Sequence, residues 1–147
     1  MLEDLEPLAR FIQSATTTRA GSNLVFEICS VTVEQAEALR IEIGIELEGY
    51  KHILDDGSIR HVIKQHGNRD KEELRGQVAV TEMDFTLIPS ILTEYDKVRF
   101  GGRSSLGLDV IIFEKVIIDT YFYLVEVRTG RKRLCMKTLY KRKAPIQ

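Results

Sequence analysis

Three strand-like segments near the carboxyl end restrict the fold more than any other feature of the sequence. Apolar and alternating residues typical of β-strands occupy residues 109–115, 121–127 and 134–140. The short stretch 128–131 between the last two predicts a hairpin turn, in which Gly130 can take a positive φ. Consecutive strands joined in this way pair antiparallel, so we expect the chain to be built around an antiparallel sheet.

Helices are predicted to precede these strands. Helical patterns cover residues 2–14, 32–43 and 59–66. A further helix is expected to start near Thr81 and to cover residues 83–87, and Pro89 then restarts or bends it before a last turn that runs to Tyr95. Ser58 and Gly67 are expected to cap the two ends of the third helix. Further strands are predicted over 24–29 and 41–47, and loops over 14–23 and 100–108. Helices followed by a strand meander indicate an α+β domain.

Charge is distributed unevenly along a chain that is nearly neutral on average. The 147 residues carry 21 Lys and Arg against 22 Asp and Glu, a formal net charge of −1. Residues 128–143 contain eight basic residues and no acidic one, which leaves residues 1–127 with a net charge of −9. The basic cluster suits the backbone of RNA or DNA. It equally suits a solvated edge that protects the last strand from aggregation.

Composition and missing motifs narrow the class of protein further. With 44% hydrophobic and 29% charged residues, the chain fits one globular domain and is neither collagen-like nor wholly disordered. No apolar run is long enough to cross a membrane and the acidic amino end is no secretory signal, so we expect a cytoplasmic protein or one delivered into a target cytoplasm. Cys29 and Cys135 match no metal spacing and are expected to be reduced.

Histidines are the first candidates for chemistry, because imidazole exchanges a proton near neutral pH. His66 continues the apolar stripe of the predicted helix 59–66 and lies at its carboxyl end, where the helix dipole favours the imidazolium. This position suits a proton donor or a phosphate-binding cation, although His66 would also simply close the last turn before Gly67. His52 and His61 are expected on the solvated surface.

Hydroxyl and amine groups also gather on the predicted strands. Alternation along the last strand places Thr138 and Tyr140 on one face together with Met136, and Lys137 on the other face. Lys115 ends an earlier strand. A cation with two hydroxyls nearby suits a phosphate site, but these residues are also ordinary components of strands.

Four segments occur in an order that is characteristic of one group of proteins. They are HVIKQHG (61–67), RGQVAVTEMDFTLIPSIL (75–92), GLDVIIFEK (107–115) and YFYLVEVRTGRKRLCMKTLYKRK (121–143). Together they resemble the phage branch of the barnase–EndoU–colicin–RelE-like nucleases, often found at the carboxyl end of MuF-type phage head-morphogenesis proteins and polymorphic toxins. The resemblance implies helices packed on a four-stranded antiparallel sheet. We expect residues 1–49 to be an acidic segment of separate role and residues 50–147 to form the nuclease-like domain.

The resemblance also implies a mechanism, which is metal-independent cleavage of RNA by attack of the ribose 2′-hydroxyl. His66 would be the acid or base, and Lys115 would stabilise charge on the phosphate. Thr138 and Tyr140 would position the phosphate or the ribose. Further residues are expected to contact the nucleic-acid backbone: His61, Arg131, Arg133, Lys137 and Lys141.

A toxin or effector of phage or prophage origin is the function that follows from this resemblance. RNA, with tRNA among the candidates, is the expected substrate, and an immunity protein is an expected kind of partner. Neither a metal, another cofactor nor a membrane is expected to take part. The alternative is a catalytically inactive, phage-derived protein that binds RNA or another protein through the same sheet.

Overall fold

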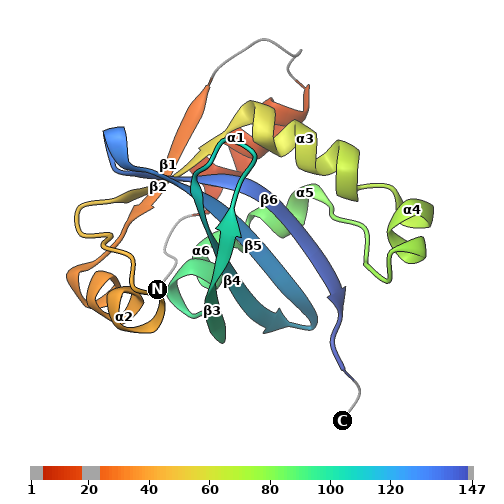
Figure 1. The fold of residues 1–147 in the computed structure, drawn as a ribbon. Coiled ribbons are helices and arrows are strands. Elements are labelled where there is room, and N and C mark those ends of the chain that lie inside the picture. The colour runs from red at the N-terminus through yellow and green to blue at the C-terminus, as the bar shows by residue number, and fades with distance from the viewer. Residues whose placement is uncertain (1–4, 18–23, 146–147) are drawn as a thin grey trace.

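A twisted six-stranded sheet lies at the centre of the protein (Figure 1). The structure, a computed structural model, describes residues 5–17 and 24–145. The strand order is β1-β2-β6-β5-β4-β3, in which β2 and β6 are parallel and the other neighbours are antiparallel. The strands are β1 (Val25–Ser30), β2 (Lys51–Asp55), β3 (Lys97–Arg103), β4 (Asp109–Ile117), β5 (Asp119–Arg128) and β6 (Arg133–Lys143).

The α+β class is confirmed, but the expected four-stranded antiparallel sheet is wrong. The strands β1 and β2 pair with each other and extend the sheet at one side. Residues Lys51, His52 and Ile53 of β2 run parallel to the start of β6. Parallel neighbours need a long connection, which the helices and strands between β2 and β6 supply.

Capping residues explain where several helices begin. Thr32 Oγ1 accepts a hydrogen bond of 3.1 Å from the N–H of Gln35, and Gln35 Oε1 accepts one of 3.1 Å from the N–H of Thr32. Thr81 and Asp84 form a similar capping box, and Pro89 lies in the first turn of the next helix, as the sequence predicts. The helices are α1 (Glu6–Thr17), α2 (Val33–Ile43), α3 (Asp56–His66), α4 (Arg69–Leu74), α5 (Glu82–Phe85) and α6 (Ile88–Thr93), with a 3₁₀ turn over Thr129–Arg131.

Two predicted segments differ from the structure and a third is only partly described. Residues 41–47 do not form a strand, because α2 extends to Ile43 and Gly44, at a φ of 75°, ends it. Residues 100–103 of the predicted loop instead belong to the edge strand β3. The predicted loop 14–23 is helical up to residue 17, and its remainder lies outside the described residues.

Two turns use residues other than those expected. α3 begins at residue 56, so Ser58 lies inside its first turn, whereas Gly67 ends the helix as predicted. In the β5–β6 hairpin the left-handed residue is Lys132, at a φ of 51°, and Gly130 is not among the residues with positive φ. The β4–β5 turn also uses a residue other than glycine at positive φ, since it places Ile118 at a φ of 65°.

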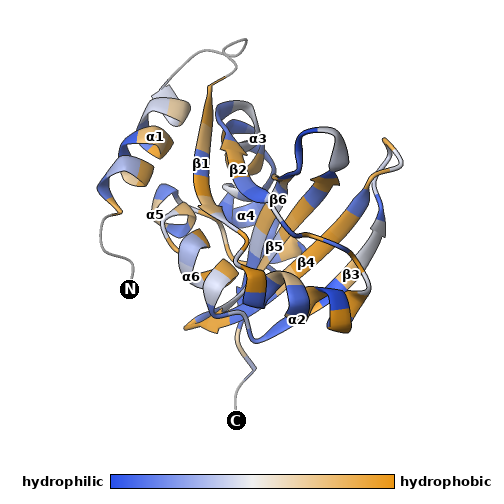
Figure 2. Cartoon of the chain, turned by 90° about the vertical axis from the view of Figure 1, so that its left-hand side faces the viewer, coloured by the Kyte–Doolittle hydropathy of each residue, from blue (hydrophilic) through white to orange (hydrophobic). Residues whose placement is uncertain are grey.

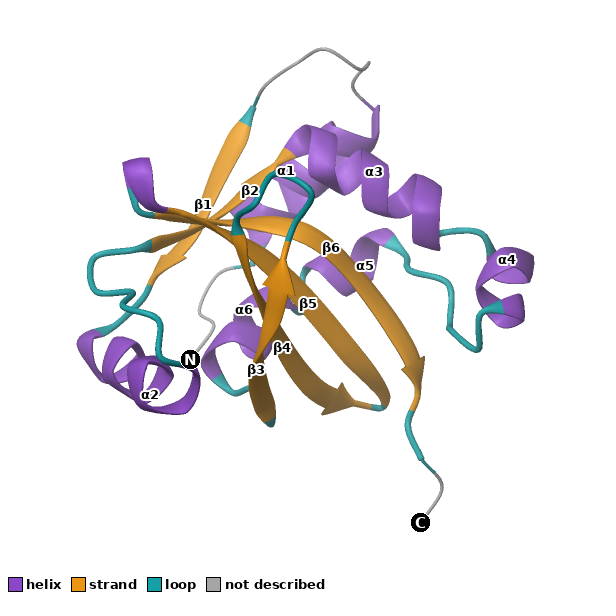
Figure 3. Ribbon diagram, viewed as in Figure 1, coloured by secondary structure: helices purple, strands orange, loops and turns teal. Residues whose placement is uncertain are grey.

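Helices cover one face of the sheet. Figure 2 shows α1, α5 and α6 together on one side of the strands, and Figure 3 shows α3 running beside β6. The apolar core takes alternate residues of β5, among them Tyr121, Tyr123 and Val125. Phe122 and Leu124 point away from this core. We call the face that bears Phe122 and Leu124 the open face, and the other one the helix face.

A β-bulge in β6 changes which of its residues point toward the helices. The pairing passes from Leu124 with Thr138 to Val125 with Met136, so Lys137 is an extra residue in β6. Met136 is therefore buried on the helix face while Thr138 lies on the open face. The prediction that Met136 and Thr138 share a face is wrong, because simple alternation does not continue through a bulge.

The amino-terminal elements pack into the same core as the rest of the chain. Leu8, Ile12 and Ala15 of α1 are buried, and α1 packs on α3 and α5. The carbonyl oxygen of Ala15 accepts a hydrogen bond of 3.2 Å from Arg60 of α3. The predicted division of the chain at residue 50 stays a prediction. None of the described helices has the length and apolar character of a membrane-spanning segment.

Candidate active site

His66, at the end of α3, is oriented by a buried carboxylate. Its Nδ1 lies 3.1 Å from Oε2 of Glu72, whose side chain is completely buried. The other oxygen of Glu72 accepts a hydrogen bond of 2.7 Å from Arg75. A carboxylate only accepts hydrogen bonds, so Nδ1 carries a proton and Nε2 is the nitrogen left for proton exchange. Nε2 has no hydrogen-bond partner within the described part of the chain.

The chain folds back after α3, which brings Glu72 to His66. Gly67 ends α3, and Asn68 caps α4 by accepting a hydrogen bond of 3.0 Å from the N–H of Lys71. The N–H of Val80 then donates to the carbonyl oxygen of His66 at 2.7 Å. The Val80 contact ties the segment after α4 to the end of α3, so that Glu72 of α4 is held beside the His66 ring.

The ring of Tyr140 lies beside His66, and a second aromatic ring and a guanidinium group lie beside Tyr140. The ring centres of His66 and Tyr140 are 5.8 Å apart, and Tyr140 stacks on Phe122 with centres 4.8 Å apart. The guanidinium carbon of Arg142 lies 5.6 Å from the centre of Phe122 and 5.8 Å from that of Tyr140. Aromatic faces can stack on bases and guanidinium groups bind phosphates. We call His66, Glu72, Phe122, Tyr140 and Arg142 the His66 cluster.

The structure brings Tyr140 to His66 and places Thr138 on the same face of β6 as Tyr140. The prediction that these two hydroxyl residues share a face is thus confirmed, because both follow the bulge and the strand alternates regularly between them. Both side chains are half-buried, so the surface that they form is accessible from solvent.

Lys115 is not brought to this cluster. In the sheet register it lies opposite Tyr121, which in turn lies opposite Lys141, so these three residues share the helix face. Nζ of Lys115 donates a hydrogen bond of 2.7 Å to the carbonyl oxygen of Glu94. The expectation that Lys115 gathers with Thr138 around one phosphate is therefore wrong, because the sheet lies between them.

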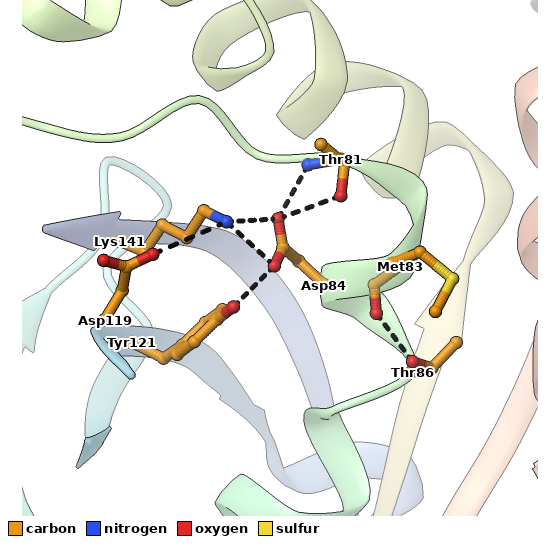
Figure 4. Close-up of polar contacts among 7 residues, drawn as sticks. All are labelled: Thr81, Met83, Asp84, Thr86, Asp119, Tyr121 and Lys141. Carbon is orange, nitrogen blue, oxygen red and sulfur yellow. Dashed lines mark hydrogen bonds and ion pairs between the residues drawn. The ribbon is translucent and has the colours of Figure 1, made fainter. Parts of the chain in front are cut away.

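Lys141 also lies on the helix face, where its charge is already paired (Figure 4). Nζ lies 3.0 Å from both carboxylate oxygens of Asp84 and 3.9 Å from Asp119. Asp84 also accepts hydrogen bonds of 2.6 Å from the hydroxyl of Tyr121 and 2.7 Å from the N–H of Thr81. The predicted contact of Lys141 with a nucleic-acid backbone is corrected, because its ammonium group is buried in this ion pair.

Burial raises the pKa of the Tyr121 phenol, and its hydrogen bond to Asp84 raises that pKa further. Tyr121 therefore stays protonated and remains a hydrogen-bond donor to Asp84. We call Asp84, Tyr121 and Lys141 the Asp84 cluster. It joins α5 to β5 and β6 on the helix face.

The other basic residues predicted to contact nucleic acid lie in two separate places, one beside the β5–β6 hairpin and one on α3. Arg131, Arg133 and Lys137 line one hollow beside the β5–β6 hairpin. His61 is exposed on α3, as its spacing predicts, and does not line that hollow. The basic residues of the carboxyl end thus do not form one continuous set, because Lys141 points to the other face of the sheet.

His52 is not on the surface, contrary to the prediction. It is 4% exposed in β2 and meets Phe113 edge-on, with ring centres 5.8 Å apart. Burial lowers the pKa of His52 to about 4, so the ring is neutral at pH 7. Cys29 and Cys135 are free thiols, as expected, and burial raises the pKa of each. No set of three or more His, Cys, Asp or Glu side chains in the described ranges could hold a metal ion.

Three members of the His66 cluster were not predicted from the sequence, namely Glu72, Phe122 and Arg142. Phe122 had a usable signal, because it alternates with core residues on a predicted strand, whereas Arg142 lies beyond the predicted strand 134–140. Glu72 had no such signal, since nothing in the charged run RDKEEL shows which of its acidic residues will be buried. Its role follows only from the turn that reverses the chain between α3 and α4.

Comparison with known proteins gives one assignment. No curated protein and no solved structure gives a significant match to the chain. A family model described as phage-Barnase-EndoU-ColicinE5/D-RelE like nuclease3 matches residues 30–145, which include the whole His66 cluster and the Asp84 cluster. The match covers well over half of the sequence. This chain therefore belongs to the phage-Barnase-EndoU-ColicinE5/D-RelE like nuclease family.

Proposed function

We propose that the chain is a ribonuclease whose reaction takes place at the His66 cluster. The observation that carries this proposal is the pairing of His66 with the buried Glu72, which leaves Nε2 as the exchangeable nitrogen. A histidine held by a carboxylate is well suited to move a proton during phosphodiester cleavage. Membership of a nuclease family supports the same class of reaction.

Each side chain of the cluster has a role in the proposed reaction. Nε2 of His66 takes the proton of the ribose 2′-hydroxyl or returns one to the leaving oxygen, and Glu72 stabilises the imidazolium formed. Arg142, which lies over the ring of Tyr140, stabilises charge that develops on the phosphate. The half-buried ring of Tyr140, backed by the buried ring of Phe122, offers a surface on which a base stacks, and the hydroxyls of Thr138 and Tyr140 position the phosphate or the ribose.

Cleavage of RNA in EDTA by wild-type protein and by His66→Gln tests the proposal. Loss of an acid or base costs about 100- to 10,000-fold in rate, so His66→Gln should lose nearly all activity. A matched substitution in the same helix, Lys64→Gln, removes an exposed cation and should leave cleavage intact. Attack by the 2′-hydroxyl also predicts products with cyclic phosphate ends and no cleavage where the ribose is replaced by deoxyribose. Equal cleavage by wild-type protein and His66→Gln would contradict the role of His66.

Binding without cleavage is the second candidate function, and one observation favours it. Two cations expected at the site, Lys115 and Lys141, lie on the helix face, so fewer charges face a substrate than the resemblance implies. Wild-type protein that binds RNA but leaves it intact in the assay above would support this alternative.

An effector role is proposed together with the ribonuclease activity. Production of an active ribonuclease inside a cell should stop growth, whereas His66→Gln should be tolerated at the same level of protein. Equal growth with both chains at equal protein level would count against a toxic effector. A protein inhibitor that binds the His66 cluster would be the corresponding partner.

A further inference from the structure

A basic hollow lies on the sheet beside the β5–β6 hairpin, apart from the His66 cluster. Its volume is about 830 Å³, within the range of sites that bind small organic molecules. Apolar side chains and positively charged ones both line it, so it can contact a flat ring as well as an anion. Among the lining residues are Ile53, Leu106, Leu108, Arg131, Arg133 and Lys137.

The positive charges at this hollow are only partly neutralised. Two carboxylates, Asp55 and Glu126, also line the hollow, and Glu126 pairs with Arg128 at 3.0 Å. Within the described residues, Arg131, Arg133 and Lys137 have no carboxylate oxygen within 4.0 Å. Three unpaired cations around one hollow favour an anionic ligand, because nearby like charges repel until a counter-charge is bound.

The shape of β6 brings these cations to one place. The hairpin places Arg131 at its tip, and Arg133 follows at the start of β6. The bulge then leaves Lys137 exposed as the extra residue, beside the hollow. Without the bulge, Arg133 and Tyr140 would alternate onto opposite faces. With it, both the hollow and the His66 cluster are reached from the open face.

The distance between the two sites follows from the elements that join them. Phe122 and Arg128 lie on the same face of β5, six residues apart, which corresponds to about 20 Å. Ser58 lines the hollow and lies eight residues before His66 in α3, which corresponds to about 12 Å. A polynucleotide at the His66 cluster can therefore reach the hollow with a residue a few nucleotides away from the bond that is cut.

We propose that this hollow is a binding subsite for a nucleoside phosphate, supplied by the RNA strand itself a few nucleotides from the scissile bond. The base lies against the apolar lining, and Arg131, Arg133 and Lys137 bind the phosphates. This inference rests on the proposed ribonuclease function, since it places the subsite on the path of that substrate. It predicts that the enzyme prefers strands long enough to occupy both sites.

Binding of 2′-O-methyl oligonucleotides to the full chain tests the subsite without cleavage, because the nucleophile is blocked. Fluorescence anisotropy compares a labelled dimer with a labelled decamer, and free AMP serves as the competitor that represents a free nucleotide. Wild-type protein should bind the decamer at least about tenfold more tightly than the dimer. The variant Arg131→Gln/Arg133→Gln/Lys137→Gln should lose that advantage, and its salt dependence should fall by about two in slope.

Two control variants show whether a loss of binding comes from the side chains at the hollow, from the change in net charge or from misfolding. The variant Arg10→Gln/Lys64→Gln/Lys71→Gln loses the same charge away from the hollow and should keep the decamer affinity within about threefold of wild-type. Arg131→Gln/Lys137→Gln changes only exposed residues and should show most of the loss while the fold is retained.

Each outcome decides the proposal. Equal decamer binding by wild-type protein and the hollow variant would overturn the subsite. Tight binding of AMP in the hollow without any gain for the decamer would show that free nucleotide, not the strand, is the ligand. An inactive wild-type protein that shows the length-dependent binding would refute the ribonuclease function while supporting the subsite.

Discussion

Tyr140 and Lys141 are neighbours in β6, yet they belong to regions with opposite properties. Tyr140 is half-buried on the open face and contacts His66. Lys141 is 9% exposed on the helix face and pairs with Asp84. A short sequence motif on a strand can therefore hold two separate functions, because successive side chains leave the sheet in opposite directions.

The Asp84 cluster and the His66 cluster differ in how many of their polar groups have a hydrogen-bond or ion-pair partner. In the Asp84 cluster both carboxylate oxygens and the Lys141 ammonium have partners within the fold. In the His66 cluster the carboxylate of Glu72 is fully used, whereas Nε2 of His66 is left without a partner in the described chain. We expect substitutions in the Asp84 cluster to change stability and substitutions in the His66 cluster to change chemistry.

The substitution Asp84→Ala should have the largest effect on stability. It leaves Lys141 charged and buried without its main partner, which typically costs about 3–5 kcal/mol. Urea unfolding at pH 7.5 measures the loss. The paired replacement Asp84→Leu/Lys141→Met removes both charges and should recover much of the stability. A loss below about 1 kcal/mol for Asp84→Ala would show that Lys141 finds water or another partner, and the contrast between the clusters would fail.

His52 should make the helix face sensitive to pH. Its folded pKa of about 4 lies below the usual 6.5, so between these values the unfolded chain binds a proton that the folded chain does not. Stability should therefore fall as pH falls through this window, by about 2 kcal/mol at pH 5 relative to pH 7.5 from this residue.

Comparison with His52→Leu isolates this contribution, because the variant lacks the titrating ring. Unfolding free energies at pH 7.5 and pH 5 should differ by about 2 kcal/mol less in the variant than in the wild-type protein. An identical pH dependence in both proteins would mean that other groups dominate the acid sensitivity of this face.

Tyr140→Phe should have the smallest effect on stability and sharpens the comparison from the other side. It removes a hydroxyl on the open face and keeps the ring that stacks on Phe122, so unfolding should change by less than about 0.5 kcal/mol. Cleavage of RNA should nevertheless slow if the hydroxyl positions the phosphate. Tyr140→Phe that is fully active and Tyr140→Leu that is inactive would assign the role to the ring instead.

The sequence contained enough information for the fold class and for the meander. The three strands of the carboxyl half are long runs rich in aromatic and β-branched residues, and capping residues such as Thr32 and Thr81 mark helix starts directly. β2 was missed because it has only five residues, of which the three central ones are buried in succession and show no alternation. Without β2 the burial of His52 could not be predicted, since its environment comes from β6 and Phe113.

The candidate site could be predicted only in part, because the sequence does not specify which face of the sheet each residue occupies or which segments a chain reversal brings together. The structure places Tyr140 beside His66 and Thr138 on the same face of β6 as Tyr140, where strand periodicity predicts them. The assignment of Lys115 and Lys141 failed because shared membership of a motif does not specify which face a residue occupies. The contact of Glu72 with His66 depends on a chain reversal that local patterns do not describe.

The bridge between Val78 and Lys141 has a consequence for how the molecule behaves among its own copies. β2 accompanies β6 only along Arg133–Cys135, so the later part of β6 would expose unpaired backbone groups. Val78 donates its N–H to the carbonyl oxygen of Lys141 at 2.8 Å and occupies part of that edge. The backbone groups used in this bridge cannot pair with a strand from another molecule. The loop before α5 therefore helps to keep the protein from aggregating at high concentration.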